Sequence, residues 1–260
     1  MEFAFSKMHG AGNDFILVDD REGVFPAKDK DFISKLCSRR VGVGSEGLIL
    51  VQRSETSDFR MRFFNPDGTE AEMCGNGARC VAAFSWETGV VAEPAMRFDT
   101  VAGEVCAKIV SETTVKIAMP PVKDMHGDFV VAGVPHKIEV VENIGDIDVN
   151  NRGREIRYSR EFAPGGTNVD FVSYEKPHLA YVRTYERGVE AESGACGTGS
   201  VASAVIGVKN YQMAFPVVVK TSGGYELVID GDYKNGEFSN LTLTGPVEKV
   251  FSGTIRYETT

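Results

Sequence analysis

Short segments with alternating apolar and polar residues make up most of the chain. Residues 3–8, 59–64 and 105–110 carry apolar side chains at about every second position, which is the period of a half-buried β-strand. Segments with helical spacing are few, and the clearest runs over residues 29–40. Short strands at regular intervals, with one central helix in each half, predict an α+β fold and not a sheet of βαβ units.

A repeated motif marks the start of each central helix. The motif Cys74-Gly75-Asn76-Gly77 leads into a run of helix-forming residues, and so does Cys196-Gly197-Thr198-Gly199. Asn65 and Arg187 each lie nine residues ahead of their cysteine. We interpret the chain as two related halves, each presenting one cysteine where a loop becomes a helix.

A cysteine at a helix start has a particular chemistry. The first N–H groups of a helix lack intrahelical partners and carry the positive end of its dipole. A thiol there loses its proton more readily, and a carboxylate can bind beside it. A lone cysteine in a glycine-rich turn is more often a small buried hydrophobe, but the duplication favours a functional pair.

Composition and charge narrow the possible classes of protein. The 260 residues are 42% hydrophobic and 25% charged, as in globular proteins of one or two domains. A net charge of −9 argues against nucleic acid as a partner. We find no membrane-spanning apolar run and no secretion signal, which predicts a cytoplasmic protein without a membrane partner. Five cysteines at irregular spacing predict neither a disulfide framework nor a metal site.

A proline-containing segment near the middle of the chain bears on the domain organisation. Met119-Pro120-Pro121 interrupts the strand pattern, so we expect one half over residues 1–119 and the other over 120–249. A final strand within 250–260 is expected to complete the first half.

Gly42, Gly44 and Gly47 match a dinucleotide-binding pattern by letters, but they precede a strand where the motif requires a strand-to-helix turn.

Several motifs together resemble those of the diaminopimelate epimerases, in the family's order and over essentially the whole chain. Either Cys-Gly unit alone would also suit proline racemase-like proteins. The more specific segments are His9-Gly10-Ala11-Gly12-Asn13-Asp14-Phe15, Phe64-Asn65-Pro66-Asp67-Gly68, Met73-Cys74-Gly75-Asn76-Gly77-Ala78-Arg79-Cys80, Tyr185-Glu186-Arg187-Gly188 and Ala195-Cys196-Gly197-Thr198-Gly199.

The resemblance implies both a fold and an activity. The fold is two pseudo-symmetric α+β domains, each a set of antiparallel strands wrapped around a central helix, with the active site in the interdomain cleft. The activity is epimerisation of LL-diaminopimelate to meso-diaminopimelate, on the route to lysine and peptidoglycan. The resemblance further implies no pyridoxal phosphate, no other cofactor, no metal, and a homodimer.

The same resemblance assigns roles to individual residues. Cys74 and Cys196 would be the catalytic acid–base pair. His136 and Glu186 would tune the cysteines, and Glu186 would also line the substrate site. The remaining substrate-binding residues would be Asn13, Asn65, Gly75, Asn76, Asn168, Arg187, Gly197 and Thr198. The chain departs from the pattern at Val134, where many members have Asn, and at Gly47, where some have Gln.

Other functions remain open from the residues alone. A cofactor-independent racemase or epimerase acting on proline or hydroxyproline would need the same cysteine pair. An isomerase on this fold without the pair is disfavoured, because both cysteines are present. A binding module that holds an amino acid without turning it over is the alternative outside the enzymes.

Overall fold

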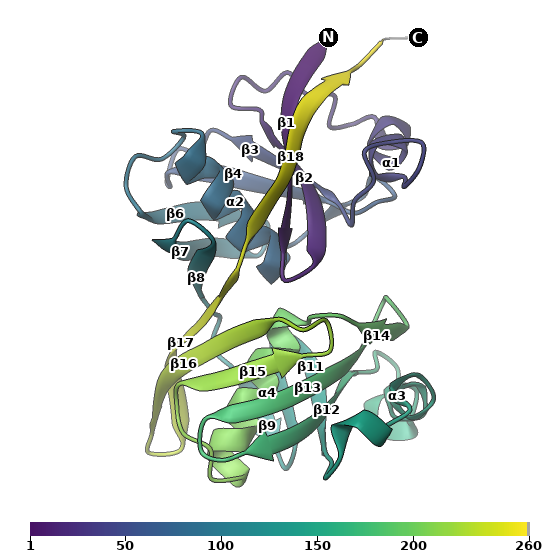
Figure 1. The fold of residues 1–260 in the computed structure, drawn as a ribbon, viewed down its shortest axis with the longest axis vertical. Coiled ribbons are helices and arrows are strands. Elements are labelled where there is room, and N and C mark those ends of the chain that lie inside the picture. Colours follow the sequence, from purple (N-terminus) through teal and green to yellow (C-terminus); the bar gives the residue numbers. More distant parts are fainter. Residues whose placement is uncertain (259–260) are drawn as a thin grey trace. The chain divides into compact units, whose positions relative to one another are not determined.

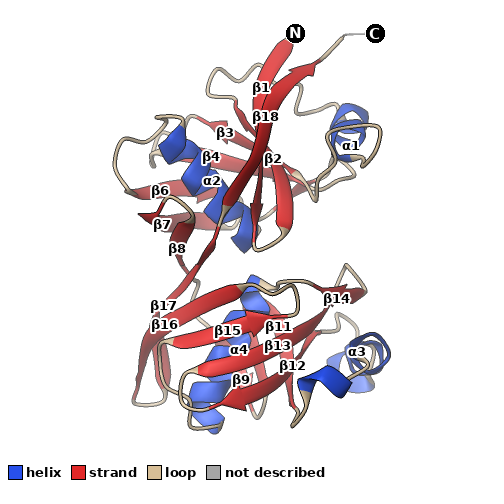
Figure 2. Cartoon of the chain, viewed as in Figure 1, coloured by secondary structure: helices blue, strands red, loops and turns tan. Residues whose placement is uncertain are grey.

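The computed structural model describes residues 1–258 and divides them into two compact units (Figure 1). Unit 1 comprises Met1–Ile117 and the chain from Pro246 to the end of the described residues, and unit 2 comprises Ala118–Gly245. Residues 259–260 of the predicted segment 250–260 lie outside the described residues. Strands predominate over helices in both units (Figure 2), which confirms the predicted α+β class.

Unit 1 is a mixed sheet with strand order β18-β1-β2-β3-β4-β6-β7-β8, and the short β5 pairs beside β4. Helix α1 lies between β2 and β3 in sequence, and α2 between β5 and β6. The bounds are β1 Glu2–Gly10, β2 Asn13–Asp19, α1 Lys30–Cys37, β3 Leu48–Gln52, β4 Phe59–Phe64, β5 Glu70–Ala71, α2 Gly75–Glu87, β6 Ala95–Thr100, β7 Gly103–Ser111, β8 Thr114–Ala118 and β18 Glu248–Arg256.

Unit 2 is a mixed sheet with strand order β9-β10-β11-β12-β13-β15-β16-β17, and the short β14 pairs beside β13. Helix α3 lies between β11 and β12 in sequence, and α4 between β14 and β15. The bounds are β9 Lys123–His126, β10 Phe129–Ala132, β11 Val134–Val140, α3 Val149–Arg157, β12 Asn168–Glu175, β13 Leu179–Glu186, β14 Ala191–Ser193, α4 Gly197–Asn210, β15 Val217–Thr221, β16 Glu226–Lys234 and β17 Glu237–Pro246, with 3₁₀ turns η1 Ile144–Asp146 and η2 Arg160–Phe162.

The two units therefore share one spatial order of strands and pairings, and they differ in that the edge strand comes last in the chain in unit 1 (β18) and first in unit 2 (β9). The expectation of purely antiparallel strands without βαβ connections was wrong, because each unit contains two parallel pairs. These are β2–β3 and β4–β6 in unit 1, and β11–β12 and β13–β15 in unit 2. A helix lies between the two strands of every parallel pair in sequence, because parallel strands require a long crossover connection.

The central helices α2 and α4 are buried along most of their length. Residues 76–85 of α2 and 199–207 of α4 are all buried. Strands β1, β2, β3, β4 and β7 pack against α2, and β10, β11, β12, β13, β15 and β16 pack against α4. A helix buried over so many consecutive positions lies within a core, so each unit holds a cysteine-led helix at its centre.

The peripheral helices have more conventional boundaries. Helix α1 begins where the Asp29 carboxylate accepts the Phe32 N–H at 2.9 Å, and α3 begins where Asp148 accepts the Asn151 N–H at 3.1 Å. Such caps satisfy an N–H group that has no partner within the helix. The buried face of α1 packs Ile33 and Leu36 into the apolar cluster of unit 1. This packing limits α1 to Lys30–Cys37, within the predicted range 29–40.

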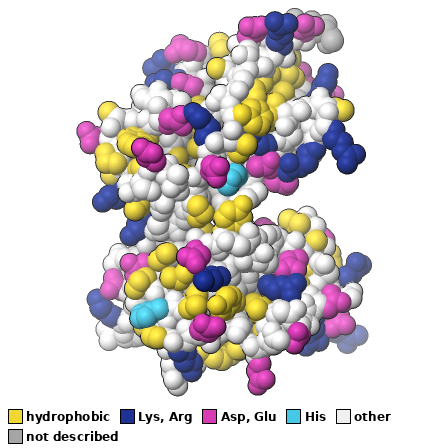
Figure 3. Space-filling model, in the orientation of Figure 1, with side chains coloured by type: hydrophobic (Ala, Val, Ile, Leu, Met, Phe, Trp, Pro, Cys, Tyr) yellow, Lys and Arg dark blue, Asp and Glu magenta, His cyan; other side chains and the backbone are white. Residues whose placement is uncertain are grey.

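The surface and the helices bear on possible partners. Charged side chains of both signs are scattered over the viewed face of each unit, and no extended basic area appears there (Figure 3). Within residues 1–258, none of the helices has both the length and the apolar character needed to cross a bilayer.

Candidate active site

Cys74 is the last residue before helix α2, as the repeated motif predicted. Its backbone is extended (φ −132°, ψ 123°), and its carbonyl accepts the Ala78 N–H at 2.7 Å. Its side chain does not cap the helix. The Asn13 amide, at the start of β2, lies with its Nδ2 3.9 Å from the Cys74 Sγ. Asn13, which was predicted to bind the substrate, therefore lies beside the cysteine.

A buried arginine lies directly behind this helix start. Arg79 is 0% exposed, and its Nη2 donates a hydrogen bond to the Asn76 Oδ1 at 2.8 Å. Its Nη1 donates to the Gly75 carbonyl at 3.4 Å. We call Cys74, Asn13, Asn76 and Arg79 the Cys74 cluster. The predicted site residues Gly75 and Asn76 thus belong to the first turn of α2. The Arg79 guanidinium that hydrogen-bonds to this turn was not among the predicted residues.

Cys196 holds the equivalent position before helix α4 and is 7% exposed. Its backbone is extended (φ −109°, ψ 112°). Its Sγ accepts the Gly199 N–H at 3.4 Å, so this sulfur caps its own helix. The absence of a side chain at Gly199 is required, because a Cβ there would collide with the Asp170 carboxylate.

A chain of polar groups leads inward from Cys196. Thr198 Oγ1 lies 3.4 Å from the Cys196 Sγ and 3.0 Å from the His136 Nε2. The His136 Nδ1 lies 2.7 Å from the Asp170 Oδ2, and both side chains are 0% exposed. The Thr184 hydroxyl donates to the other Asp170 oxygen at 2.7 Å. We call Cys196, Thr198, His136, Asn168, Asp170 and Glu186 the Cys196 cluster.

Polar groups on both sides orient the His136 ring. The Arg187 backbone N–H donates to the Asn168 Oδ1 at 2.7 Å, which turns the Asn168 Nδ2 toward the His136 Nε2 at 3.4 Å. A carboxylate only accepts, so the His136 Nδ1 donates its proton to Asp170. Asn168 and Thr198 both lie beside the other ring nitrogen, Nε2.

Negative charge and burial keep Cys196 protonated. Burial raises the pKa of the Cys196 thiol well above its ordinary value, and the carboxylates of Glu186 and Asp170 raise it further. The Thr198 hydroxyl and the Gly199 N–H oppose this pKa shift. Burial also raises the pKa of the Glu186 carboxyl, against opposing effects of Ser193 and His136. These effects favour a neutral thiol at position 196.

The remaining predicted residues lie at the edges of the two clusters. Asn65 occupies the β4–β5 turn, where its Nδ2 donates to the Thr69 hydroxyl at 3.2 Å. Gly197 is the first residue of α4. The Arg187 guanidinium lies half-buried on the β13–β14 hairpin, with Nη1 3.5 Å from the carbonyls of Gly165 and Gly166. Asn65 and Arg187 therefore directly follow the first strand of the hairpin that precedes their cysteine, β4 in unit 1 and β13 in unit 2.

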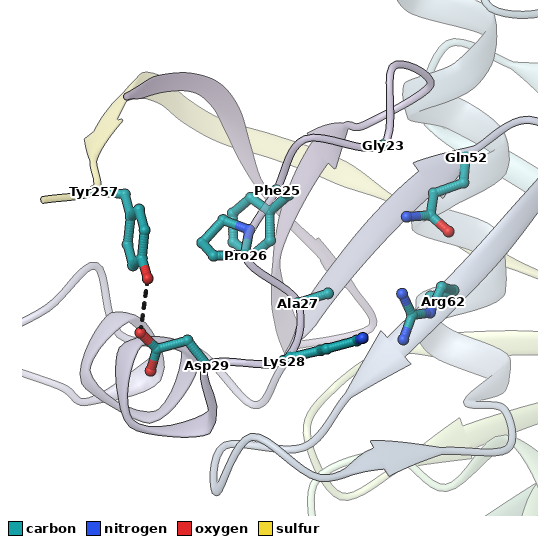
Figure 4. Close-up of a pocket in the computed structure, with 9 residues that line it drawn as sticks. All are labelled: Gly23, Phe25, Pro26, Ala27, Lys28, Asp29, Gln52, Arg62 and Tyr257. Carbon is teal, nitrogen blue, oxygen red and sulfur yellow. Dashed lines mark hydrogen bonds between the residues drawn. The ribbon is translucent and has the colours of Figure 1, made fainter. Parts of the chain in front are cut away.

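A surface cavity of unit 1 is separate from these residues. It has a volume of about 540 Å³ and contains none of the predicted site residues (Figure 4). The Tyr257 hydroxyl donates to the Asp29 carboxylate at its rim, and Arg62 pairs with Glu70 at 2.8 Å. Across residues 1–258, the structure contains no group of three His, Cys, Asp or Glu side chains arranged to hold a metal ion.

Comparison with known proteins identifies the family. The family model described as Diaminopimelate epimerase matches residues 5–124 and 129–250. A diaminopimelate epimerase of Aquifex aeolicus is 39% identical over 277 aligned positions, covering 98% of each chain. One of Archaeoglobus fulgidus is also 39% identical, covering 98% of this chain and 97% of the relative. The chain belongs to the diaminopimelate epimerase family.

Solved structures outside close sequence range show the same fold. A phenazine biosynthesis protein of the PhzF family from Bacillus anthracis has a TM-score of 0.75 at 16% identity, covering 99% of this chain and 100% of its own. A hydroxyproline epimerase from Agrobacterium vitis has a TM-score of 0.65 at 13% identity, covering 98% and 92%. At such identities the likeness extends to the fold alone, shared by this diaminopimelate epimerase family member.

One of the two departures from the family pattern has a packing explanation. Gly47 is buried, and a Cβ there would lie 2.5 Å from the Phe63 ring and 2.6 Å from the Phe64 carbonyl. The Phe63 ring thus fills the space that a glutamine would need. Val134 begins β11, opposite Ala132 and two residues before His136. Nothing in the structure explains the choice of valine there.

Sequence reasoning did not assign a role to Arg79 of the Cys74 cluster, to Asp170 of the Cys196 cluster, or to Thr184, which donates to Asp170. Asp170 carried a usable signal, since a carboxylate within Val169-Asp170-Phe171-Val172 interrupts an apolar strand. A buried charge requires a partner, which pointed to a polar network around β12. Arg79 gave the corresponding signal within Ala78-Arg79-Cys80-Val81, because the residues around it are apolar and helical.

Proposed function

We propose that this chain interconverts LL- and meso-diaminopimelate by a two-cysteine acid–base mechanism without pyridoxal phosphate. The observation that carries the proposal is the placement of Cys74 and Cys196, each immediately before a buried helix, in units of the same topology. Family membership supports diaminopimelate as the substrate. We further propose that the substrate lies in a cleft where the two cysteines address opposite faces of one carbon.

Inversion at the α-carbon divides into two proton transfers. One cysteine acts as a thiolate and takes the α-proton, so the Cα–H bond breaks and its electron pair passes into the α-carboxylate. The other cysteine, a thiol, then gives its proton to the opposite face of the carbon. The pair finishes with thiol and thiolate exchanged, and proton exchange with solvent restores the starting state. A base and an acid on opposite faces are needed because one group cannot reach both.

The helix starts are suited to the charge that develops during this reaction. Gly75 and Asn76 in one unit, and Gly197 and Thr198 in the other, present first-turn N–H groups beside their cysteines. Such donors stabilise an enediolate more than the ground-state carboxylate, and losing one costs about 2.7–4 kcal/mol in comparable oxyanion sites. In this proposal, closure over the substrate excludes water and strengthens these interactions.

The other predicted residues would hold the distal end of the substrate. The Arg187 guanidinium offers a planar fork that matches a carboxylate, and the amides of Asn13, Asn65 and Asn168 offer donors and acceptors. The resemblance also implies a homodimer, which sedimentation velocity would test.

The experiment is solvent-deuterium incorporation from LL-diaminopimelate in D₂O. The wild type should place deuterium at the α-carbon as meso product forms. Cys74→Ala and Cys196→Ala should each lower epimerisation by about 10³-fold, since acid–base residues contribute about 10²–10⁴-fold. Cys106→Ala is the matched control, because Cys106 is exposed on β7, and it should keep wild-type turnover.

Two other outcomes would replace this function. Turnover of proline or hydroxyproline, without turnover of diaminopimelate, would identify a different cofactor-independent epimerase. Calorimetric binding of diaminopimelate without any wild-type turnover, and with affinity unchanged in both alanine variants, would identify a binding module.

A further inference from the structure

The side chain of Arg79 is a buried cation without a carboxylate partner. It is 0% exposed, and none of the ion pairs within residues 1–258 includes it. Its Nε has no hydrogen-bond partner there either. A buried charge is strongly unfavourable unless an opposite charge or several hydrogen bonds compensate for it. The two hydrogen bonds to Asn76 and the Gly75 carbonyl leave this compensation incomplete.

The direction of the Arg79 side chain points to the compensating group. Long side chains on a helix lean toward its N-terminus, and the Arg79 guanidinium bonds to Asn76 and Gly75 in the first turn. Burial lowers the pKa of the guanidinium, and negative charge on Cys80 and Cys74 raises it. Those two thiols are the groups whose charges act on Arg79.

Cys80 is unsuited to carry the negative charge. It is 0% exposed, and burial raises the pKa of its thiol far above the ordinary value, so it stays protonated at neutral pH. Among residues 1–258, the other titratable side chains on strands packed against α2 form no hydrogen bond or ion pair with Arg79. These are Glu2, Lys7, His9, Asp14, Asp19, Arg60, Arg62, Glu104, Cys106 and Lys108. Cys74 is the group that remains.

We propose that Arg79 is a positioning residue whose buried guanidinium is the counter-ion of a resting Cys74 thiolate. The inference rests on the proposed function for its purpose, because a thiolate base is what the first proton transfer uses. Its physical basis is the burial of the Arg79 side chain and the hydrogen bonds that this side chain makes. The charge acts together with the N-terminus of α2, since both place positive potential beside the sulfur.

The test is site-resolved alkylation of the folded protein with iodoacetamide across pH 5–10, read by peptide mass spectrometry. No substrate is present, so failure of the proposed function would leave this measurement intact. Arg79→Met should slow alkylation of Cys74 at pH 7 by about tenfold, the effect of one pH unit in the titration midpoint. Arg79→Lys keeps the charge and should retain most of the wild-type rate.

Several controls separate an electrostatic role from a structural one. Arg60→Met removes an exposed arginine from the same unit and should leave the Cys74 profile unchanged. Cys106 in every sample reports the activity of the reagent. A folded Arg79→Met protein with the wild-type Cys74 profile would overturn the proposal. If that variant does not fold, the wild type still decides, because a Cys74 midpoint at or above about pH 8.5, the value of a free thiol, would also overturn it.

The pH dependence of stability gives a second readout. A thiolate stabilised in the folded state contributes stability above the titration of the unfolded thiol, and this contribution is lost as the pH falls. The stability of the wild type relative to Arg79→Met should therefore rise between pH 6 and pH 9 in urea titrations. A structural arginine would give a constant difference, and that result would contradict the proposal.

Discussion

The two cysteine clusters occupy equivalent positions in units of the same topology, yet their strands differ in polarity. Parallel pairing sets Ile16 opposite Leu48 in unit 1 and His136 opposite Asn168 in unit 2. The unit 1 pair is fully apolar, and the unit 2 pair belongs to the buried polar network behind Cys196. Equivalent strand positions thus carry apolar side chains in unit 1 and hydrogen-bonding side chains in unit 2.

On the central helices the charged residue lies in unit 1 and the apolar residue lies in unit 2, which is the reverse of the strands. Arg79 and Val201 each lie five residues after their cysteine, and both are buried. Along the strands, Leu50 pairs with Arg62 where Asp170 pairs with Thr184, so Leu50 corresponds to Asp170. Unit 1 therefore buries a cation on its helix, and unit 2 buries a carboxylate on its strand.

In this proposal, the opposite signs of the two buried charges give the two cysteines different protonation states before the substrate binds. A cation beside a sulfur favours thiolate, and carboxylates beside a sulfur favour thiol. A two-base reaction needs one of each before substrate arrives. Duplication supplies two helix starts of the same shape, and the buried charges make them complementary.

The largest expected effect comes from replacing Asp170 of unit 2 with leucine, the residue that unit 1 has at the equivalent position, Leu50. Asp170→Leu should lower the free energy of unfolding by about 3 kcal/mol, because His136 and Thr184 each lose a buried acceptor at about 1–3 kcal/mol. Chemical denaturation measures the change. Glu175→Leu, at the exposed end of the same strand, is the matched control and should keep the wild-type midpoint.

The double variant His136→Ile with Asp170→Leu sharpens this comparison. It copies Ile16 and Leu50, and it no longer leaves the imidazole N–H without an acceptor. It should therefore recover about 1 kcal/mol relative to the single variant, while epimerisation remains impaired. A double variant less stable than Asp170→Leu would show that the polar network has no independent energetic role.

A smaller effect is expected at Thr198, which connects Cys196 to His136. Thr198→Val removes the hydroxyl and should lower the epimerisation rate by up to about tenfold, the equivalent of one hydrogen bond of about 0.5–1.5 kcal/mol. Initial rates with LL-diaminopimelate measure the change. Thr198→Ser keeps the hydroxyl and should stay near the wild type, and equal losses in both variants would exclude a role for the hydroxyl.

The smallest effect concerns Glu186, whose pKa is raised by burial. A carboxyl with a raised folded-state pKa contributes stability at low pH and loses it as the pH rises through that pKa. Glu186→Gln removes the buried charge, so the variant should gain stability relative to the wild type between pH 4 and pH 8. Urea midpoints at several pH values measure this, and a relative loss with rising pH would contradict the assignment.

The sequence predicted the positions that depend on local chemistry. Cys74 and Cys196 stand at helix starts because Cys-Gly-x-Gly followed by helix formers specifies such a start locally. The α+β class followed from strand alternation. The parallel pairs were missed, because alternation of side chains reports burial and does not report which strand is the neighbour.

The partners of the buried charges were equally hard to predict. Arg79 lies in a motif rich in glycine, where an arginine is ordinarily solvated, and only its packing inside the ring of strands around α2 makes it a buried cation. Asp170 becomes a partner of His136 through the parallel pairing of β11 with β12. The apolar neighbours of both residues signalled a buried charge, but the group that each one contacts depends on long-range packing that no local pattern contains.

The most direct test of this account is the ionisation state of each cysteine in the resting wild-type protein. Cysteine labelled with ¹³C at Cβ gives one NMR signal for each of the five cysteines, and Cys74→Ser and Cys196→Ser assign the two that matter. The account predicts that at pH 7, without substrate, Cys74 has the chemical shift of a thiolate and Cys196 that of a thiol. The same state at both positions, or the reverse assignment, would contradict it.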